Sequence, residues 1–489
     1  MPPAHSVKRS LGLLGATKIM AFALSLLAAI VVSRMLSPHE IGIFSISASL
    51  IGFAHVLREF GVEQYIVQTK ELTRSRRRAA FTATLLISLS IACVLYAVKP
   101  IAAEFYEESG VDRVMSLLAL NFLILPFVTP LRAQLQREMQ FSKIAATDLL
   151  NHFCATAVTI FFVSTGSGYT SMAFGSVAGN VCALFVLIFL SPRGALDWPT
   201  LRGLREVFRF GSRSSVASFS LEIGDAAPDL VLGRTLGFSD AAYFSRANGV
   251  LSMTVELLRS VVQSVFFPVF SRSHRDGHDL KELYLQSSSK FLAAMLPALS
   301  LMALLSGPLI ELMFGPQWSK SALLAVMLCA FAILTGPVML APYALVAIGQ
   351  VGSLMRCRLI LAVVKVLVLL SSTWLALEVT TALLLLVSLV ELRVFTVALR
   401  VALGISLSTL WVRTRWSYTL IPVTLLPPTL VLWILQQWGI ASPVLHVGLI
   451  ALLGGACWTT SALLTQHPLR AELAAVARSA IAVFARRKA

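Results

Sequence analysis

The stretch LGLLGATKIMAFALSLLAAIVV, residues 11–32, decides the fold class of this chain. Its only charged residue is Lys18. A continuous apolar run of this kind suits an α-helix that crosses a lipid bilayer, which needs about 20 such residues. Strands of a membrane barrel would instead alternate polar and apolar residues with a period of two. The stretch therefore predicts a membrane-spanning helix.

Similar runs recur along the whole chain. Its 489 residues are 57% hydrophobic and 13% charged, and the mean hydropathy is +0.81. Soluble domains carry about 25% charged residues, so the main solvent of this chain must be lipid. We predict an all-α polytopic membrane protein with about fourteen spans of the usual length. The predicted spans are 11–33, 41–65, 79–103, 111–131, 144–165, 169–191, 212–236, 240–270, 284–310, 321–347, 353–375, 379–401, 418–437 and 444–464.

The net charge of +16 is distributed unevenly between the loops. Most of the Lys and Arg residues fall between alternate pairs of spans, as in RSRRR (74–78), whereas the segment 104–112 is acidic. Basic loops of membrane proteins stay in the cytoplasm. We therefore expect both termini to lie on the cytoplasmic side of the membrane. The basic loops are expected to contact membrane lipids and not nucleic acid.

Several function classes are disfavoured because their motifs are missing. The six cysteines form no CxxC or Cys/His cluster, so we predict no disulfide, no metal site and no cofactor. No GxxxxGK[ST] phosphate loop is present, and the loops are too short for a soluble domain. No acid/base constellation occurs in the predicted outer loops. We expect a protein without catalytic residues and not an enzyme.

A repeat divides the chain. SRMLSPHEIGIFSIS (33–47) matches GRTLGFSDAAYFSRA (233–247) at a constant offset of 200 residues, with Arg34 aligned to Arg234. Six spans per copy would give the two copies the same orientation, with a central cavity between them near the middle of the membrane. We predict two six-helix lobes, residues 1–205 and 206–402, followed by two additional transmembrane helices and a cytoplasmic tail in 403–489.

Short motifs carry a family resemblance that runs in order from about residue 9 to about residue 400. They include VSRMLSPHEIG (32–42), EFGVEQYIVQTKELT (59–73), LQREMQFSKIA (135–145), DLVLGRTLG (229–237) and FGPQW (314–318). The chain resembles the polysaccharide transporter family of Wzx-like flippases, in the multidrug/oligosaccharidyl-lipid/polysaccharide superfamily.

The resemblance implies a fold of two six-helix bundles plus two helices, in agreement with the span count. It also implies transport by alternating access. The cargo would be an undecaprenyl-diphosphate-linked oligosaccharide, moved to the periplasmic leaflet for O-antigen or exopolysaccharide synthesis. A polysaccharide polymerase and a chain-length regulator are candidate partners.

Charges inside spans cost about 2.5–3.5 kcal/mol each on insertion scales, so they are functional candidates. Five basic residues are predicted to line the cavity and bind the anionic cargo: Lys18, Arg58, Arg246, Arg259 and Lys365. Two alternatives stay open. Lys18 and Arg58 would also suit snorkelling toward the headgroups. Arg259 would also suit an ion pair with Glu256, three residues before it.

Glu222, Asp225 and Asp229 stand at i, i+3 and i+7, on one face of the seventh predicted span. An acidic stripe of this kind would not face lipid. One interpretation is a Na⁺ or H⁺ site that couples transport to an ion gradient. The other is an internal salt-bridge lattice with Arg246, Arg259 or Lys365.

Other polar residues within the spans are predicted to make contacts between helices, and Arg34 and Arg234 to meet acidic neighbours at the outer ends of their spans. The predicted contact residues include Glu63, Asp148, Asn151, His152 and Glu391.

Three other functions remain as alternatives. A multidrug exporter of the same superfamily should carry an acid early in the first lobe, but no Asp or Glu occurs between Met1 and Pro38. A lipid II flippase would share the fold and a cationic cavity. A membrane-bound polymerase or ligase would need a large outer loop with catalytic residues, and the predicted outer loops are short.

Overall fold

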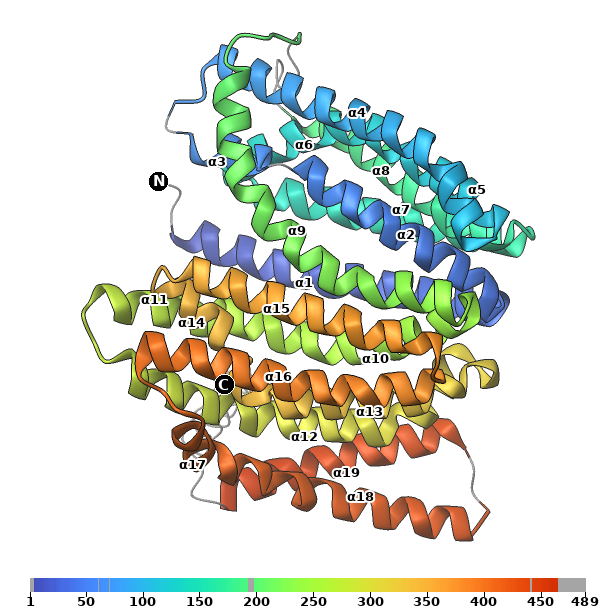
Figure 1. Cartoon of the computed structure of the whole chain (residues 1–489), viewed down its shortest axis with the longest axis vertical. Coiled ribbons are helices and arrows are strands. Elements are labelled where there is room, and N and C mark those ends of the chain that lie inside the picture. The colour runs from blue at the N-terminus through green and yellow to red at the C-terminus, as the bar shows by residue number, and fades with distance from the viewer. Residues whose placement is uncertain (1–3, 60, 70, 192–197, 440–441, 465–489) are drawn as a thin grey trace, which may run out of the picture. The chain divides into compact units, whose positions relative to one another are not determined.

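The computed structural model describes residues 4–464 except 60, 70, 192–197 and 440–441. Every regular element in these residues is a helix, which confirms the all-α prediction (Figure 1). Eleven of the helical segments are long and apolar enough to cross a membrane. The chain is therefore a multi-pass membrane protein, and the count of about fourteen spans stays a prediction.

The first eight helices cover the six spans predicted for the first lobe. Their bounds are α1 Ala4–Met35, α2 Pro38–Glu59, α3 Val62–Gln68, α4 Arg74–Tyr106, α5 Ser109–Ala119, α6 Asn121–Arg137, α7 Phe141–Ser164 and α8 Ser171–Leu190, with the short η1 at Gly168–Thr170.

The next helices cover the six spans predicted for the second lobe. Their bounds are α9 Leu204–Thr235, α10 Phe238–Val261, η2 Val262–Phe266, α11 Phe267–Arg275, α12 Leu280–Phe314, η3 Pro316–Trp318, α13 Lys320–Thr335, η4 Gly336–Val338, α14 Ala341–Ala347, α15 Val351–Leu370, η5 Ser371–Thr373 and α16 Leu377–Leu403.

The chain ends its described part with α17 Leu407–Tyr418, α18 Leu420–Gln437 and α19 Pro443–Leu464. α17 was not among the predicted spans. All three helices pack on α12. Trp458 Nε1 of α19 donates to the Ala293 carbonyl of α12 at 2.9 Å, and a Cβ on Gly454 would lie 2.4 Å from Leu301.

Several predicted spans are broken by local backbone chemistry. Gly61, with a φ of 64°, separates α2 from α3 in a conformation that glycine adopts without a steric penalty. The π-helix η2 precedes Pro268, and η4 begins at Gly336–Pro337. Proline lacks the N–H group that a continuous α-helix uses, so both breaks have a cause in the sequence.

The predicted repeat is visible in the helix bounds. α1 ends at Met35 and α2 begins at Pro38, while α9 ends at Thr235 and α10 begins at Phe238, each 200 residues later. The break between α2 and α3 also has a counterpart in η2, between α10 and α11. The duplication therefore extends to the irregular joints of the two copies.

Contacts divide the chain into two compact units, Met1–Ala242 and Tyr243–Ala489. α9 packs within the first unit, against α2, α3 and α4. The lobes predicted at 1–205, 206–402 and 403–489, and the cavity between them, stay predictions.

Candidate functional site

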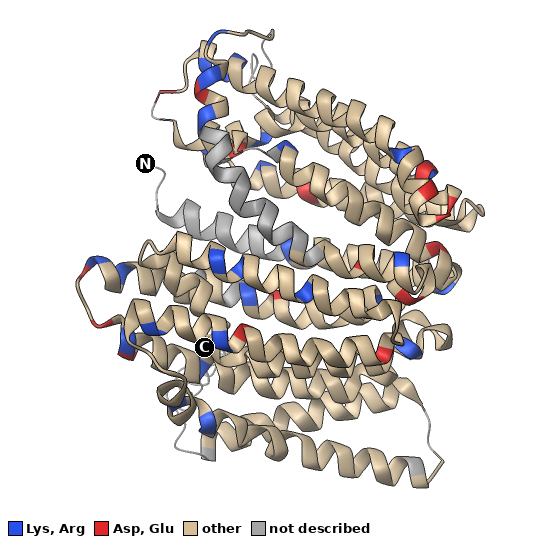
Figure 2. Ribbon diagram, in the orientation of Figure 1, with Lys and Arg blue, Asp and Glu red and all other residues tan. Residues whose placement is uncertain are grey.

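Charges segregate to the two ends of the first unit (Figure 2). Lys and Arg gather near the starts of α4 and α9, and Asp and Glu near the end of α4 and the start of α5. We call these the inner and outer ends, following the predicted orientation. At the inner end, Arg76 lies 3.4 Å from Glu206, and Arg78 donates to the Trp198 carbonyl at 2.7 Å. The basic run 74–78 thus holds the segment that leads into α9.

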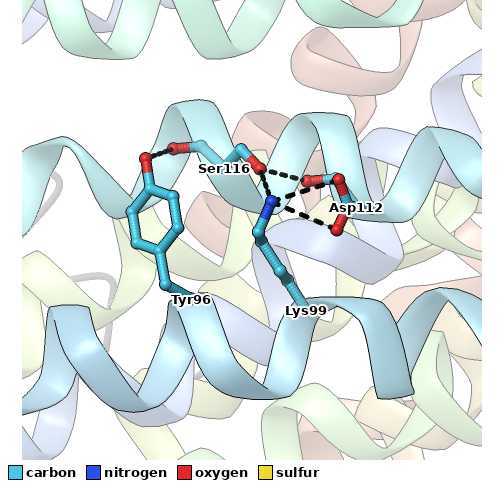
Figure 3. A network of polar contacts seen from close by, with 4 residues as sticks. All are labelled: Tyr96, Lys99, Asp112 and Ser116. Carbon is cyan, nitrogen blue, oxygen red and sulfur yellow. Dashed lines mark hydrogen bonds and ion pairs between the residues drawn. The ribbon is translucent and has the colours of Figure 1, made fainter.

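At the outer end, a polar network joins α4 to α5 (Figure 3). Lys99 Nζ lies 3.3 Å from an Asp112 carboxylate oxygen and donates to Ser116 Oγ at 2.8 Å. The Tyr96 hydroxyl donates to the Ser116 carbonyl at 3.3 Å. Because Lys99 neutralises Asp112, this acid of the outer segment has a structural role in the hairpin.

A second outer contact joins α4 to α9. Arg234 Nη2 lies 3.2 Å from Glu107, and its guanidinium lies 5.3 Å from the centre of the Phe105 ring. The neighbouring Tyr106 hydroxyl donates to the Leu230 carbonyl at 3.2 Å. This ion pair confirms the prediction that Arg234 meets an acidic neighbour.

One residue of the predicted acidic stripe on α9 contacts α2. Ser49 Oγ donates to Asp229 Oδ2 at 2.8 Å, and Asp229 is half-buried. The side chains of Glu222 and Asp225 lie outside the described residues, so their predicted roles stay predictions. At Asp229, the stripe faces α2, whose first turn is the end of the VSRMLSPHEIG motif.

Glycine allows α2 to approach both α9 and Phe238, the first residue of α10. A Cβ on Gly42 would lie 2.1 Å from the backbone oxygen of Phe238, and one on Gly233 would lie 2.2 Å from Ile46 Cδ1. Gly42, Ile46 and Ser49 share one face of α2 because they stand at i, i+4 and i+7. We call Gly42, Ile46, Ser49, Asp229 and Gly233 the α2–α9 seam. Small residues let membrane helices approach closely in this way.

Arg58 lies in the inner half of the first unit, and its side chain is buried, with 8% exposed. Its Nη1 donates to Thr129 Oγ1 of α6 at 2.9 Å. One turn further along α6, Arg132 forms two hydrogen bonds to Asp148 of α7. The second pair confirms the predicted interhelical contact of Asp148. Arg58 is thus a desolvated cation at the contact of α2 with α6, and a separate ion pair joins α6 to α7 one turn away.

A ladder of amides crosses the same unit. Asn180 of α8 donates to Asn121 of α6 at 2.9 Å, Asn121 donates to Ser176 at 3.1 Å, and Asn151 of α7 donates to Asn180 at 3.4 Å. Of these three asparagines, only Asn151 was predicted to contact another helix. Asn121 and Asn180 could also have been recognised, because an amide side chain within an apolar span needs a hydrogen-bond partner.

The other predicted cations have diverse surroundings. The Lys18 side chain is exposed on α1. The Arg246 guanidinium lies 5.6 Å from the ring centres of both Phe314 and Trp318, the first and last residues of the FGPQW motif. Arg259 lies 3.5 Å from Glu256, which confirms the alternative of a local ion pair. Of these three, Arg246 has the most defined site, a cation held against two aromatic faces.

Lys365 lies on α15, close to an acid of α16. Glu391 is half-buried within the electrostatic range of both Lys365 and Arg358. The Arg358 guanidinium lies 5.6 Å from the ring centre of Phe395, also on α16. Glu391 is thus near two cations of the neighbouring helix, and its predicted interhelical contact stays a prediction. Arg358 is a further cation inside a helix and was not among the predicted site residues.

The predicted site residues fall in both units. Lys18, Arg58 and Asp229 lie in the first, and Arg246, Arg259 and Lys365 lie in the second. α9, α10 and α15 carry most of these residues and are not among the eleven candidate spans of the described chain. All three of these helices contain charged residues.

Comparison with known proteins adds independent findings. A family model described as "Polysaccharide biosynthesis protein" matches residues 31–323. The lipopolysaccharide biosynthesis protein WzxC of Escherichia coli (strain K12) is 22% identical over 325 residues, covering 65% of each chain. The succinoglycan biosynthesis transport protein ExoT of Rhizobium meliloti (strain 1021) is 25% identical over 369 residues, covering 74% of this chain and 73% of ExoT.

The fold is similar to that of a solved membrane protein. The lipid II flippase MurJ, in an inward closed conformation, superposes with a TM-score of 0.74 at 11% sequence identity. The match covers 91% of this chain and 97% of MurJ. At this identity the likeness shows the fold alone.

Proposed function

Because the chain belongs to the polysaccharide biosynthesis protein family, we propose that it is a flippase for lipid-linked oligosaccharide repeat units. The cargo is an oligosaccharide on undecaprenyl diphosphate, moved across the inner membrane by alternating access. The product serves exopolysaccharide or O-antigen synthesis. The observation that carries the proposal is the family match over residues 31–323, more than half of the chain.

The charges inside the helices support an anionic cargo. The diphosphate and the glycan cannot cross hydrocarbon unaided, and a cationic path lowers that barrier while the polyprenyl tail stays in lipid. Arg58 is the best-placed phosphate ligand of the first unit because its buried, planar guanidinium can bind two oxygens at once. Lys365 has the corresponding role in the second unit, and Lys18, Arg246 and Arg259 extend the path.

The direction and setting of transport follow from the charge pattern. We place both termini in the cytoplasm, because the basic loops then stay inside. The two lobes, 1–205 and 206–402, alternate access to a cavity between them. A polymerase and a chain-length regulator then use the flipped units outside. We assign no catalytic step to this chain, because its part is translocation.

Deletion of the gene tests this function. Lipid-linked oligosaccharide should accumulate in the cytoplasmic leaflet of the deletion strain, and the polymer should disappear from the cell surface. The measurement is mass spectrometry of extracted lipids, with leaflet position determined by accessibility to a glycosidase in inverted vesicles. The wild-type gene on a plasmid should reverse both changes. Unchanged surface polymer, with no accumulated lipid-linked glycan, would contradict the proposal.

Coupling of transport to an ion gradient can be tested at Asp229. We propose that Asp229 binds Na⁺ or H⁺, and Asp229→Asn removes its charge while keeping the shape that Ser49 contacts. In proteoliposomes, a Na⁺ or proton gradient should accelerate transport by the wild type, and the variant should lose this acceleration while retaining slow transport without a gradient. Ser49→Ala is the matched control, because it removes the hydrogen bond from Ser49 to Asp229 but keeps the carboxylate. Equal gradient dependence in Asp229→Asn and the wild type would rule out Asp229 as the coupling group.

A further inference from the structure

The helix α17 has one face packed on the bundle and another that is exposed. The packed face is buried and consists of Leu410, Thr414 and Ser417, at i, i+4 and i+7. On the other side, Trp411 and Trp416 are 53% and 63% exposed, and the exposed Arg415 stands between them around the helix. We call Trp411, Arg415 and Trp416 the α17 surface. Large apolar side chains that gather on an exposed helix face indicate a binding partner.

Contacts within the second unit fix the direction of this surface. Ser417 Oγ donates to the Ser289 carbonyl of α12 at 3.1 Å, in a buried position. The Tyr418 hydroxyl donates to the Ile333 carbonyl of α13 at 3.3 Å, and the Tyr418 ring lies 5.6 Å from the Trp411 ring. Because these contacts hold one face of α17 on α12 and α13, the α17 surface points away from these two helices.

The two arginines of α17 have different surroundings. Residues two apart point about 200° apart around a helix, so Arg413 and Arg415 lie on opposite sides of α17. Arg413 Nη2 donates to both carboxylate oxygens of Glu282, at 3.1 and 3.0 Å. Arg415 instead lies over the Trp416 ring, 5.4 Å from its centre, and forms no ion pair with a carboxylate of the described residues. Because the indole ring is neutral, Arg415 keeps its positive charge for a further ligand.

The ion pair of Arg413 with Glu282 also indicates the depth of α17 in the membrane. α12 has 35 residues, which makes it about 52 Å long, whereas the hydrocarbon layer is about 30 Å thick. The charged first turn of α12, which carries Glu282, therefore lies among the lipid headgroups. The preceding α11 ends with the basic residues Arg272, His274 and Arg275. Basic residues of this kind favour the cytoplasmic leaflet.

A phospholipid headgroup has the chemistry that the α17 surface requires. Indole rings prefer the headgroup level of a bilayer, where their apolar body and polar N–H group are both accommodated. A guanidinium binds two phosphate oxygens at once, and it attracts an anionic lipid more strongly than a zwitterionic one. A soluble protein would have to displace the headgroups to reach the two rings. The bilayer itself therefore supplies the better partner.

We propose that Trp411, Arg415 and Trp416 form a binding site for an anionic phospholipid of the bilayer. Arg415 binds the phosphate, and the two indole rings pack against the glycerol and the first carbons of the acyl chains. The bound lipid holds the junction of α17 and α18 at the headgroup level. This inference goes beyond the proposed function, because the lipid is a component of the membrane and not the cargo.

The test is native mass spectrometry of the purified full chain, titrated with phosphatidylglycerol or with phosphatidylcholine of the same acyl chains. Arg415→Gln should weaken the binding of phosphatidylglycerol at one site about fivefold, because one cation near the membrane surface is lost. The binding of phosphatidylcholine should stay unchanged. Arg415→Lys should retain part of the preference, because it keeps the charge and loses the planar fork.

Arg413→Gln is the matched control, because it removes the same charge from the same helix. Its side chain is bound to Glu282, so its loss should lower the melting temperature and leave the affinity for phosphatidylglycerol within about twofold of the wild type. Other basic sites of the chain contribute equally to both variants. Trp416→Leu gives an independent measurement. It removes the ring that Arg415 contacts and should weaken phosphatidylglycerol binding about threefold.

Several results would overturn the inference. Wild-type affinity of Arg415→Gln for phosphatidylglycerol would do so, and equal weakening by Arg415→Gln and Arg413→Gln would show an effect of net charge alone. An equal loss of phosphatidylcholine would show that the surface does not select an anionic headgroup. The same spectra report the oligomeric state. If the wild type is a dimer that Arg415→Gln converts to a monomer, the α17 surface is an interface between two copies of the chain, and the lipid site is refuted.

Discussion

Gly42→Ala should reduce transport at least about 10-fold and lower the melting temperature, because a single methyl group does not fit into the α2–α9 seam. The added Cβ would lie 2.1 Å from the backbone oxygen of Phe238 and 2.5 Å from its backbone carbon. Backbone atoms cannot rotate away as a side chain can. The helices must separate, and overpacking of this kind costs about 1–3 kcal/mol, or more where the backbone must move.

A matched control is available on α10. Gly249 is also helical, and a Cβ there would meet nothing within 4 Å. Gly249→Ala should therefore leave transport unchanged and raise stability by up to about 1 kcal/mol, since alanine restricts the unfolded chain more than glycine does. The measurements are transport into proteoliposomes and thermal unfolding in detergent. If Gly42→Ala behaves like Gly249→Ala, close approach of α2 to the start of α10 is not needed for function.

Arg58→Gln should have the second largest effect, a loss of about 10- to 100-fold in transport, since a charge-assisted hydrogen bond is worth about 1.5–3 kcal/mol. Arg58 is the buried cation that we assign to the diphosphate, and its side chain is only 8% exposed. Arg58→Lys should retain part of the activity, because it keeps the charge and loses the planar fork. Transport rates in proteoliposomes, normalised to the amount of folded protein, give the comparison.

Thr129→Val separates binding from structure in this experiment. It removes the hydrogen-bond acceptor that Arg58 uses, at 2.9 Å, and keeps the guanidinium. We expect a loss of only a fewfold, smaller than that of Arg58→Gln. A Thr129→Val loss as large as that of Arg58→Gln would mean that Arg58 acts by holding α2 against α6. Wild-type transport by Arg58→Gln would remove Arg58 from the cationic path.

The sequence was sufficient to predict the helical fold because lipid imposes a simple rule. Each apolar run long enough to span the bilayer must satisfy its backbone internally, and the result is a helix. The observed bounds of α7, Phe141–Ser164, match the predicted 144–165 closely. No comparable rule decides which neighbours a given helix packs against inside the bundle. The division into units at Ala242 therefore did not follow from the spans.

Irregular features were harder to predict. The break between α5 and α6 lies at Leu120, a residue with no tendency to end a helix. The short helix α17 was not predicted because its mixture of Arg, Trp and Ser residues has neither the length nor the hydropathy of a span.

In the candidate site, the sequence predicted contacts within one helix better than contacts between helices. Sequence spacing places Arg259 near Glu256 because both lie on one helix, and the ion pair is present. The sequence cannot bring Glu391 to Lys365, because their proximity depends on the register between two helices. Asp229 likewise finds Ser49 through tertiary packing. Charged residues within spans identify the participants, and only the packing identifies their partners.

The way in which α18 and α19 attach to α12 has a consequence for the history of this chain. In water, removal of two helices would expose an apolar face and unfold the remainder, whereas in lipid the same face is simply solvated by acyl chains. The loss would include close packing, such as Gly454 against Leu301, and the indole hydrogen bond of Trp458. A helical hairpin can therefore be gained or discarded in evolution at little thermodynamic risk. Because helices added in pairs return the chain to the side from which it started, the rest of the topology is undisturbed.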